Sequence, residues 1–224
     1  MTESNGPPEP IGMNVADLRR SATGRRLDRS DLDPDPLRQF EAWFREACDG
    51  EILDPNAVTL MTVDAENRPA GRTVLLKYFD ERGFAFFTNR SSVKAIHIAA
   101  NPNVALLFFW REHGRQVSIR GIAETMPKAE TLRYFVSRPR GSQIGAWVSA
   151  QSSIISSRSL LESKFEEMKR KFADGDVPLP SFWSGYRVVP AEYEFWQGRQ
   201  NRLHDRFSYV QQDDGGWRIA RLAP

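Results

Sequence analysis

Cysteine, histidine and long apolar runs are all scarce in this 224-residue sequence, and each scarcity excludes a class of protein. The one cysteine, Cys48, excludes an internal disulfide framework and a zinc site built from cysteines. The three histidines are scattered without ligand spacing, so we expect no metal site. The longest apolar block, Val104 to Trp110, is far shorter than the roughly 18 residues that span a bilayer, so we expect no membrane partner.

The sequence also lacks a strong excess of either charge, because 31 Lys and Arg residues against 29 Asp and Glu residues leave a formal net charge of +2. Without a global basic footprint we expect no nucleic-acid partner. The N-terminal MTESNGPPEPIG lacks the basic and apolar regions of a signal peptide, which favours a cytoplasmic protein. Hydrophobic residues make up 40% of the chain, enough for a packed core.

The chain divides into an N-terminal arm and one domain. We expect residues 1–30 to be flexible, because the first twelve are rich in Pro and Gly and a basic stretch follows. That stretch is typical either of a solvated arm or of a flap that closes over an anionic ligand. Residues 31–224 are expected to form a single domain.

An amphipathic helix opens this domain at Pro36, with Asp35 as its N-cap and a left-handed Gly50 at its end. Its buried face is predicted to carry Leu37, Phe40, Trp43, Phe44 and Ala47. We interpret Cys48, near the end of the helix, as a buried small hydrophobe.

β-rich runs separated by short turns follow, which favours antiparallel pairing because parallel strands need long crossovers. The predicted strands cover 57–64, 71–80, 84–89, 104–110, 116–126, 186–198 and 204–212, and residues 214–222 close the chain. Helices are predicted at 91–102, 127–139 and 156–175. The predicted fold class is α+β, mainly antiparallel β, in a closed or nearly closed barrel with peripheral helices.

No P-loop, dinucleotide fingerprint, nucleophile elbow or HExxH motif is present. What remains are cationic and polar groups at strand ends and helix starts, which suit phosphate. Lys77 ends a strand on which Arg72 faces the other way, and the amides near Ser92 begin a helix beside Lys94. Each has an ordinary alternative, such as a solvated edge charge.

Two further clusters stand out. Tyr134 and Arg138 lie one turn apart on a predicted helix, where a basic end complementing the helix dipole is the ordinary interpretation. In FWQGRQNRLHDR an extended chain would point Arg202, His204 and Arg206 to one face, as a solvent-facing strand also would. Trp196 is typical of a core residue, although an indole also packs on a flat cofactor.

Together, several motifs resemble the pyridoxamine 5′-phosphate oxidase family over roughly Leu18 to Pro224: RTVLLK, SRPRGSQIGAWVSAQSS, LESKF, VPLPSFWSGYRV, EFWQG…NRLHDRF and the terminal RLAP. The resemblance implies an FMN-binding split β-barrel that forms a homodimer with two FMN sites at the subunit interface. It also implies oxidation of pyridoxamine 5′-phosphate and pyridoxine 5′-phosphate by O2 to pyridoxal 5′-phosphate, with H2O2 and, from the amine, ammonia.

Site residues follow from the same resemblance. FMN is expected to contact Arg72, Thr73, Val74, Leu75, Leu76, Lys77, Phe87, Thr88, Ser92, Lys94, Gln116, Gln151, Ser152, Trp196 and Arg206. The substrate is expected to contact Arg19, Arg20, Lys77, Tyr134, Arg138, Ser142, Arg202 and His204. Of these, Arg202 and His204 would be the catalytic residues over the reacting face.

Two positions depart from the family pattern, and two rival functions stay open. Val93 stands where members often carry Arg, and Ala22 where they often carry a Tyr that closes over the substrate. One rival is a flavin oxidase of the same fold that acts on another substrate, as in phenazine biosynthesis. The other is a non-catalytic protein that binds flavin or a B6 phosphate.

Overall fold

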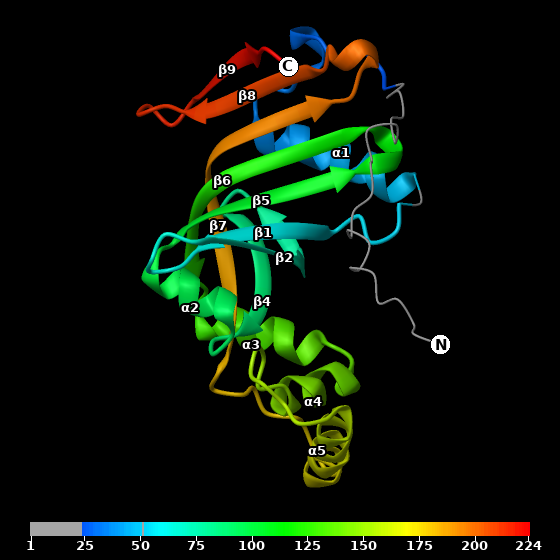
Figure 1. The fold of residues 1–224 in the computed structure, drawn as a ribbon, viewed down its shortest axis with the longest axis vertical. Coiled ribbons are helices and arrows are strands. Elements are labelled where there is room, and N and C mark those ends of the chain that lie inside the picture. The colour runs from blue at the N-terminus through cyan, green and yellow to red at the C-terminus, as the bar shows by residue number, and fades with distance from the viewer. Residues whose placement is uncertain (1–23, 51) are drawn as a thin grey trace, which may run out of the picture.

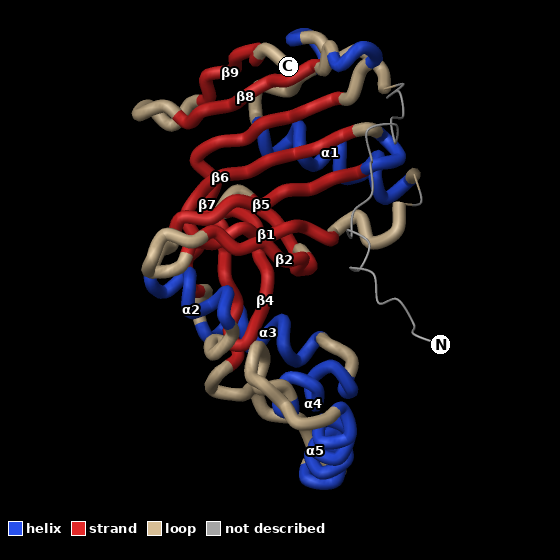
Figure 2. Tube along the Cα trace, viewed as in Figure 1, coloured by secondary structure: helices blue, strands red, loops and turns tan. Residues whose placement is uncertain are grey.

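The fold is built on a curved antiparallel sheet of nine strands. Helix α1 packs against the sheet, and helices α3, α4 and α5 project beyond one end of it (Figures 1 and 2). The computed structural model describes residues 24–50 and 52–224, so the expected contacts of Arg19 and Arg20 and the departure at Ala22 lie outside the described residues. The strand order is β2-β1-β5-β6-β7-β4-β3, with β8 pairing with β7 and β9 with β8.

The strands are β1 (Ala57–Val63), β2 (Pro69–Leu75), β3 (Tyr78–Asp80), β4 (Gly83–Asn89), β5 (Asn103–Trp110), β6 (Arg115–Thr125), β7 (Trp183–Gln197), β8 (Asp205–Gln211) and β9 (Trp217–Leu222). The α-helices are α1 (Pro36–Asp49), α2 (Val93–Ala100), α3 (Lys128–Ser137), α4 (Arg140–Val148) and α5 (Arg158–Lys171). Short 3-10 turns are η1 (Arg29–Asp31), η2 (Arg111–His113) and η3 (Gln200–Arg202). The predicted antiparallel α+β class is confirmed. Among the described residues no helix has the length and apolarity to cross a membrane.

Strand β7 connects the two ends of the molecule. Its first half pairs with β4 and its second half with β8, while β6 runs along almost all of it. The pairing of β6 with β7 shifts at Arg120–Gly121, where an added Cβ on Gly121 would collide with the carbonyl oxygen of Val189. Only glycine permits this close approach, so the sheet bends here.

Helix α1 forms as the sequence predicts. The Asp35 side chain accepts the Leu37 amide 2.9 Å away, and Pro36 occupies the first turn, where its missing N–H costs nothing. Two predictions about the end of this helix, the conformation of Gly50 and the burial of Cys48, were wrong. Gly50 has φ −79° rather than a left-handed conformation, because its N–H bonds back to the Glu46 carbonyl in a tight last turn. Cys48 is exposed, because it lies on the outer side of the helix.

The core is aromatic and centres on Phe40, which is completely buried. Its ring meets the Phe84 ring of β4 edge-on, with centroids 4.9 Å apart. It also contacts the Phe108 ring of β5, with centroids 5.0 Å apart. Trp43, one turn further, meets Phe195 of β7 edge-on at 5.2 Å. Edge-to-face contacts of this kind add to the free energy of burial. Helix α1 thus fixes one face of the sheet.

The structure corrects the sequence prediction at three further places. The predicted strand 71–80 breaks between β2 and β3, because the Lys77 amide bonds to Ala85 while the Leu76 amide bonds to Asn56. Residues 140–148 form helix α4, which the sequence analysis missed. The η3 turn interrupts the extended run that was expected to align Arg202 with His204 and Arg206.

The Phe40 ring also meets Phe79 of β3 at 5.0 Å, so it contacts rings from three strands. We therefore expect Phe40→Ala to lower the free energy of unfolding by about 3–5 kcal/mol. Urea unfolding monitored by tryptophan fluorescence measures the change. Leu53→Ala serves as the control, since Leu53 is 90% exposed and should change stability by less than about 0.5 kcal/mol. Equal effects of the two substitutions would show that Phe40 does not hold the core together.

Candidate active site

A cluster of polar and cationic side chains forms where strand β4 ends and helix α2 begins, and we call it the α2 cradle. The Asn89 side chain accepts the Ser91 amide at 2.7 Å, which turns the chain, and Ser92 then caps the helix by accepting the Ala95 amide. The members of the cradle are Arg72, Thr88, Ser92, Lys94 and Gln151. They come from β2, β4, α2 and the loop after α4.

Lys94 is the central cation of the α2 cradle. Its ammonium group donates to Thr88 Oγ1 at 3.3 Å and to Gln151 Oε1 at 3.2 Å, and the residue is only 9% exposed. Burial lowers the pKa of Lys94 below its usual value, and the nearby Arg72 lowers it further. A buried cation with only neutral partners is stabilised when an anion binds.

Arg72 is held in place by the neighbouring strand β1. It donates to Thr62 Oγ1 at 2.7 Å and to the Leu60 carbonyl at 3.1 Å, and Thr62 in turn contacts His97 Nδ1 at 3.0 Å. Burial lowers the pKa of Arg72. Within the described residues neither Arg72 nor Lys94 forms an ion pair with an acidic side chain. The cradle therefore holds two neighbouring cations without an acidic partner, an arrangement that suits an anion.

Next to the α2 cradle lies a cavity of about 330 Å³, which we call the α3 pocket. It shares Thr88 and Gln151 with the cradle. Its aromatic wall is a stack in which Phe87 lies 4.0 Å from Tyr134 and 5.1 Å from Trp183 between ring centroids. The remaining functional side chains of the pocket are Lys77, Arg138 and Ser142.

The α3 pocket is also positively charged. Arg138 lies over the Trp183 ring at 4.9 Å, and its Nη1 atom is buried with no hydrogen-bond partner among the described residues. Burial lowers the pKa of both Arg138 and Lys77, and Arg138 lowers the pKa of Lys77 further. Burial raises the pKa of Tyr134, so its phenol keeps its proton at neutral pH. Such a pocket suits a flat ring that carries a phosphate.

A third group of predicted residues crosses the sheet on β6, β7 and β8, and we call it the β8 row. Gln116 lies opposite Trp196, and Trp196 lies opposite Arg206, so the three side chains share one face. Arg206 donates to Glu194 at 2.7 Å and to the Ala223 carbonyl, and Glu194 raises the pKa of Arg206. In a single chain Arg206 is thus already paired.

Arg202 and His204 lie in the segment of chain just before strand β8. The His204 ring packs on Trp196 with centroids 4.5 Å apart, while Arg202 is exposed. Asn201 and Arg202 both have left-handed backbone conformations, with φ 57° and 62°. For a residue other than glycine this costs roughly 1–2 kcal/mol, and such strain concentrates at functional sites.

The structure brings the predicted site residues together in two separate groups. The α2 cradle and α3 pocket adjoin each other near the start of β7, whereas the β8 row, Arg202 and His204 lie near its other end. Figure 1 shows helices α2 and α3 at one end of the molecule and strand β8 at the other. At about 3.3 Å per residue, the 15 residues of β7 separate its ends by up to about 45 Å. If the expected residues form one site, each chain holds only two half-sites of it, one at each end of β7.

Comparison with known proteins identifies the family. The family model described as pyridoxamine 5′-phosphate oxidase matches residues 44–172, and that of the pyridoxine 5′-phosphate oxidase C-terminal dimerisation region matches residues 183–224. The chain belongs to the pyridoxamine 5′-phosphate oxidase family. The expected family and the oxidoreductase class are thereby confirmed.

Individual relatives agree. The chain is 59% identical to the pyridoxine/pyridoxamine 5′-phosphate oxidase of Rippkaea orientalis, over 95% of this chain and 100% of the relative. It is 52% identical to the enzyme of that name from Pectobacterium atrosepticum, over 99% and 97%.

Solved structures confirm the split-barrel fold of this family. PhzG from Burkholderia lata 383, in complex with tetrahydrophenazine-1-carboxylic acid, matches with a TM-score of 0.84 and 26% identity, over 92% of this chain and 100% of that one. A pyridoxamine 5′-phosphate oxidase-related, FMN-binding protein from Nostoc punctiforme matches with a TM-score of 0.69 and 16% identity, over 85% and 98%. The FMN cofactor expected from the sequence agrees with this description.

Sequence reasoning missed Trp183 and Thr62. Trp183 completes the aromatic wall and lies within a motif, VPLPSFWSG, that carried the resemblance, but nothing local shows that β7 starts beneath the α3 pocket. Thr62 orients Arg72 from the neighbouring strand, and only the register of β1 with β2 reveals this contact.

Because the Lys94 ammonium group has no acidic partner among the described residues, we expect its removal to stabilise the protein. Because the folded protein lowers the pKa of Lys94, the unfolded chain binds that proton more tightly, so this penalty disappears as pH rises toward the usual lysine pKa. We expect Lys94→Met to raise the free energy of unfolding of the flavin-free protein by about 0.5–2 kcal/mol at neutral pH. Chemical denaturation measures it, with the exposed Lys128→Met as control. A destabilised Lys94→Met protein would contradict the prediction.

Proposed function

We propose that this chain is an FMN-dependent oxidase that converts pyridoxamine 5′-phosphate and pyridoxine 5′-phosphate to pyridoxal 5′-phosphate with O2. The products would be H2O2 and, from the amine, ammonia. The observation that carries the proposal is the pair of adjoining cationic sites, which suits one phosphate on the cofactor and one on the substrate. Identity of 59% to a pyridoxine/pyridoxamine 5′-phosphate oxidase supports it.

The α2 cradle fits FMN. Lys94 and Arg72 offer two cations to the phosphate, and the positive end of the α2 helix dipole lies beside them. Residues 73–76, at the end of β2 and just after it, would contact the ring together with Phe87. The Ser152 hydroxyl accepts the Val93 amide at 3.3 Å and closes the cradle. When bound, FMN would supply the redox chemistry by accepting a hydride equivalent and passing electrons to O2.

The α3 pocket would bind the B6 phosphate. Arg138 and Lys77 would supply charge, Ser142 a hydroxyl, and the protonated Tyr134 a donor. Phe87 and Trp183 would hold the substrate ring flat. Holding the reacting carbon in one orientation and excluding water is the main contribution that these residues make to the rate.

Residues 31–224 would act as one domain, and two copies would complete the sites. The β8 row, Arg202 and His204 lie too far from the α3 pocket of the same chain, so they would meet that of a partner subunit. The match of residues 183–224 to a region described by its role in dimerisation supports a homodimer. Two-fold symmetry would then give two equal sites.

The phenazine-type rival rests on the fold of PhzG, but the identity of 26% to that protein is far below the 59% to a B6-phosphate oxidase. The non-catalytic rival is decided by turnover. Protein loaded with FMN is supplied with each phosphorylated vitamer, and aldehyde and H2O2 are measured. Formation of both with at least one vitamer supports the proposal, and tight binding without turnover would refute it.

Arg202→Ala should lower kcat/KM for pyridoxamine 5′-phosphate by about ten- to a hundred-fold, because a charged hydrogen bond contributes roughly 1.5–3 kcal/mol. The FMN content should stay unchanged, since the α2 cradle is untouched. Steady-state kinetics and flavin absorbance measure the two quantities. Wild-type kinetics would mean that Arg202 is a solvated surface charge.

A mixing experiment tests whether the two half-sites come from different subunits. Lys77→Met/Arg138→Met damages one half-site and Arg202→Ala/His204→Ala the other, so each homodimer should be nearly inactive. In a mixed dimer one of the two sites is intact, so random exchange should restore about one quarter of wild-type activity. No recovery despite proven subunit exchange would place the complete site within one chain.

A further inference from the structure

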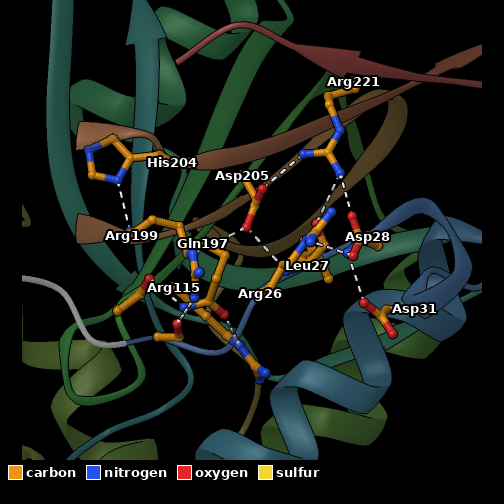
Figure 3. Close-up of polar contacts among 12 residues, drawn as sticks. Arg26, Leu27, Asp28, Asp31, Arg115, Gln197, Arg199, His204, Asp205 and Arg221 are labelled. Atoms are coloured by element: carbon orange, nitrogen blue, oxygen red, sulfur yellow. Dashed lines mark hydrogen bonds and ion pairs between the residues drawn. The ribbon is translucent and has the colours of Figure 1, made fainter. Parts of the chain in front are cut away.

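Asp205 lies behind the β8 row, where three segments of the chain converge on its buried carboxylate (Figure 3). Oδ2 accepts the Leu27 amide at 3.1 Å, and Oδ1 accepts Nη1 of Arg221 at 2.8 Å. Arg199 forms an ion pair with Oδ2 at 3.7 Å. The carboxylate thus ties together residues 24–28, the loop before β8, and strand β9.

The loop held in this way carries His204. The backbone N–H of Arg199 donates to Nδ1 of His204 at 3.0 Å. A ring nitrogen that accepts a hydrogen bond carries no proton, so the neutral ring must be protonated at Nε2. The geometry of residues 199–204 therefore selects one tautomer, and among the described residues nothing accepts a hydrogen bond from Nε2–H, which can donate to a ligand.

The loop needs an anchor because its backbone is strained. Asn201 and Arg202 are consecutive left-handed residues between the amide of Arg199 and the ring that it contacts. Such conformations persist only where the surrounding contacts fix them. The Arg199 side chain supplies these contacts, since it reaches Asp205 and also donates to the Gly24 carbonyl.

Asp205 does not itself reach the candidate site. Consecutive residues of a strand point to opposite faces, so the buried Asp205 faces away from Arg206 and the β8 row. Its effect on a ligand must pass through the loop. Arg221 also pairs with Asp28 at 3.0 Å, which fixes the carboxylate from the other side.

We propose that Asp205 is a positioning residue that, through Arg199, holds the 199–204 loop so that His204 presents a protonated Nε2 to the substrate. The proposal rests on the proposed function only in placing the substrate at His204. The tautomer itself is a property of this chain and is measurable without turnover.

The test is nitrogen NMR of protein labelled with 15N-histidine, at about pH 8, where imidazoles are mostly neutral. With three histidines in the chain, His97→Gln and His113→Gln assign the signals. In the wild-type protein His204 should show an unprotonated Nδ1 and a protonated Nε2. In Asp205→Asn both nitrogens should shift toward the averaged values of a ring that exchanges between tautomers.

Kinetics provide the second measurement. Asp205→Asn should lower kcat/KM for pyridoxamine 5′-phosphate about ten-fold while FMN content and dimer mass stay unchanged. Arg199→Gln should act in the same direction, and its side chain is 35% exposed, so it provides the test if Asp205→Asn does not fold. Arg218→Gln, an exposed arginine on β9, is the matched control and should change neither measurement.

Wild-type nitrogen shifts for His204 in both Asp205→Asn and Arg199→Gln would overturn the proposal, as would a wild-type His204 protonated at Nδ1. If the wild-type protein oxidises neither vitamer, the proposed function fails, and the NMR result still decides whether Asp205 sets the tautomer.

Discussion

Positive charge without a matching negative charge is the constraint on which the site depends. Lys94 with Arg72, and Lys77 with Arg138, form two pairs of like charges that burial and mutual repulsion both disfavour. By contrast Arg187, the one arginine that is fully buried among the described residues, pairs with Glu130 at 2.9 Å. Under the proposed function, the phosphates of FMN and of the substrate would offset this charge, so the ligand-free protein would bear the cost in stability.

The surrounding fold makes this arrangement rigid. The aromatic core between α1 and the sheet fixes β4, and β4 ends where the α2 cradle begins. The aromatic wall of the α3 pocket is joined to β4 and β7 through Phe87 and Trp183, so Arg138 is held over a ring rather than free in solvent. A rigid wall reduces the entropy lost when a flat ligand binds, which is the physical basis of pre-organisation.

The sequence predicted the elements better than their junctions. Helix α1 and the antiparallel class followed from periodicity and turn length, because these depend on neighbouring residues. The break at Lys77, helix α4 and the η3 turn depend on contacts between distant segments, such as the Arg140 side chain with the carbonyl of Gly175 at 2.9 Å. For the same reason the expected site residues could be listed from the sequence, but their division into two groups at opposite ends of β7 appears only in the structure.

That separation gives β7 a role beyond pairing. Trp183 at its start lines the α3 pocket, and Trp196 near its end lies in the β8 row, so one strand carries part of both half-sites. The bend at Gly121 sets the angle between its two halves, and a side chain there would collide with Val189. In a two-fold dimer the same bend would set how each β8 row meets the partner's α3 pocket. The curvature of the sheet, rather than any single side chain, would then determine whether the divided site closes.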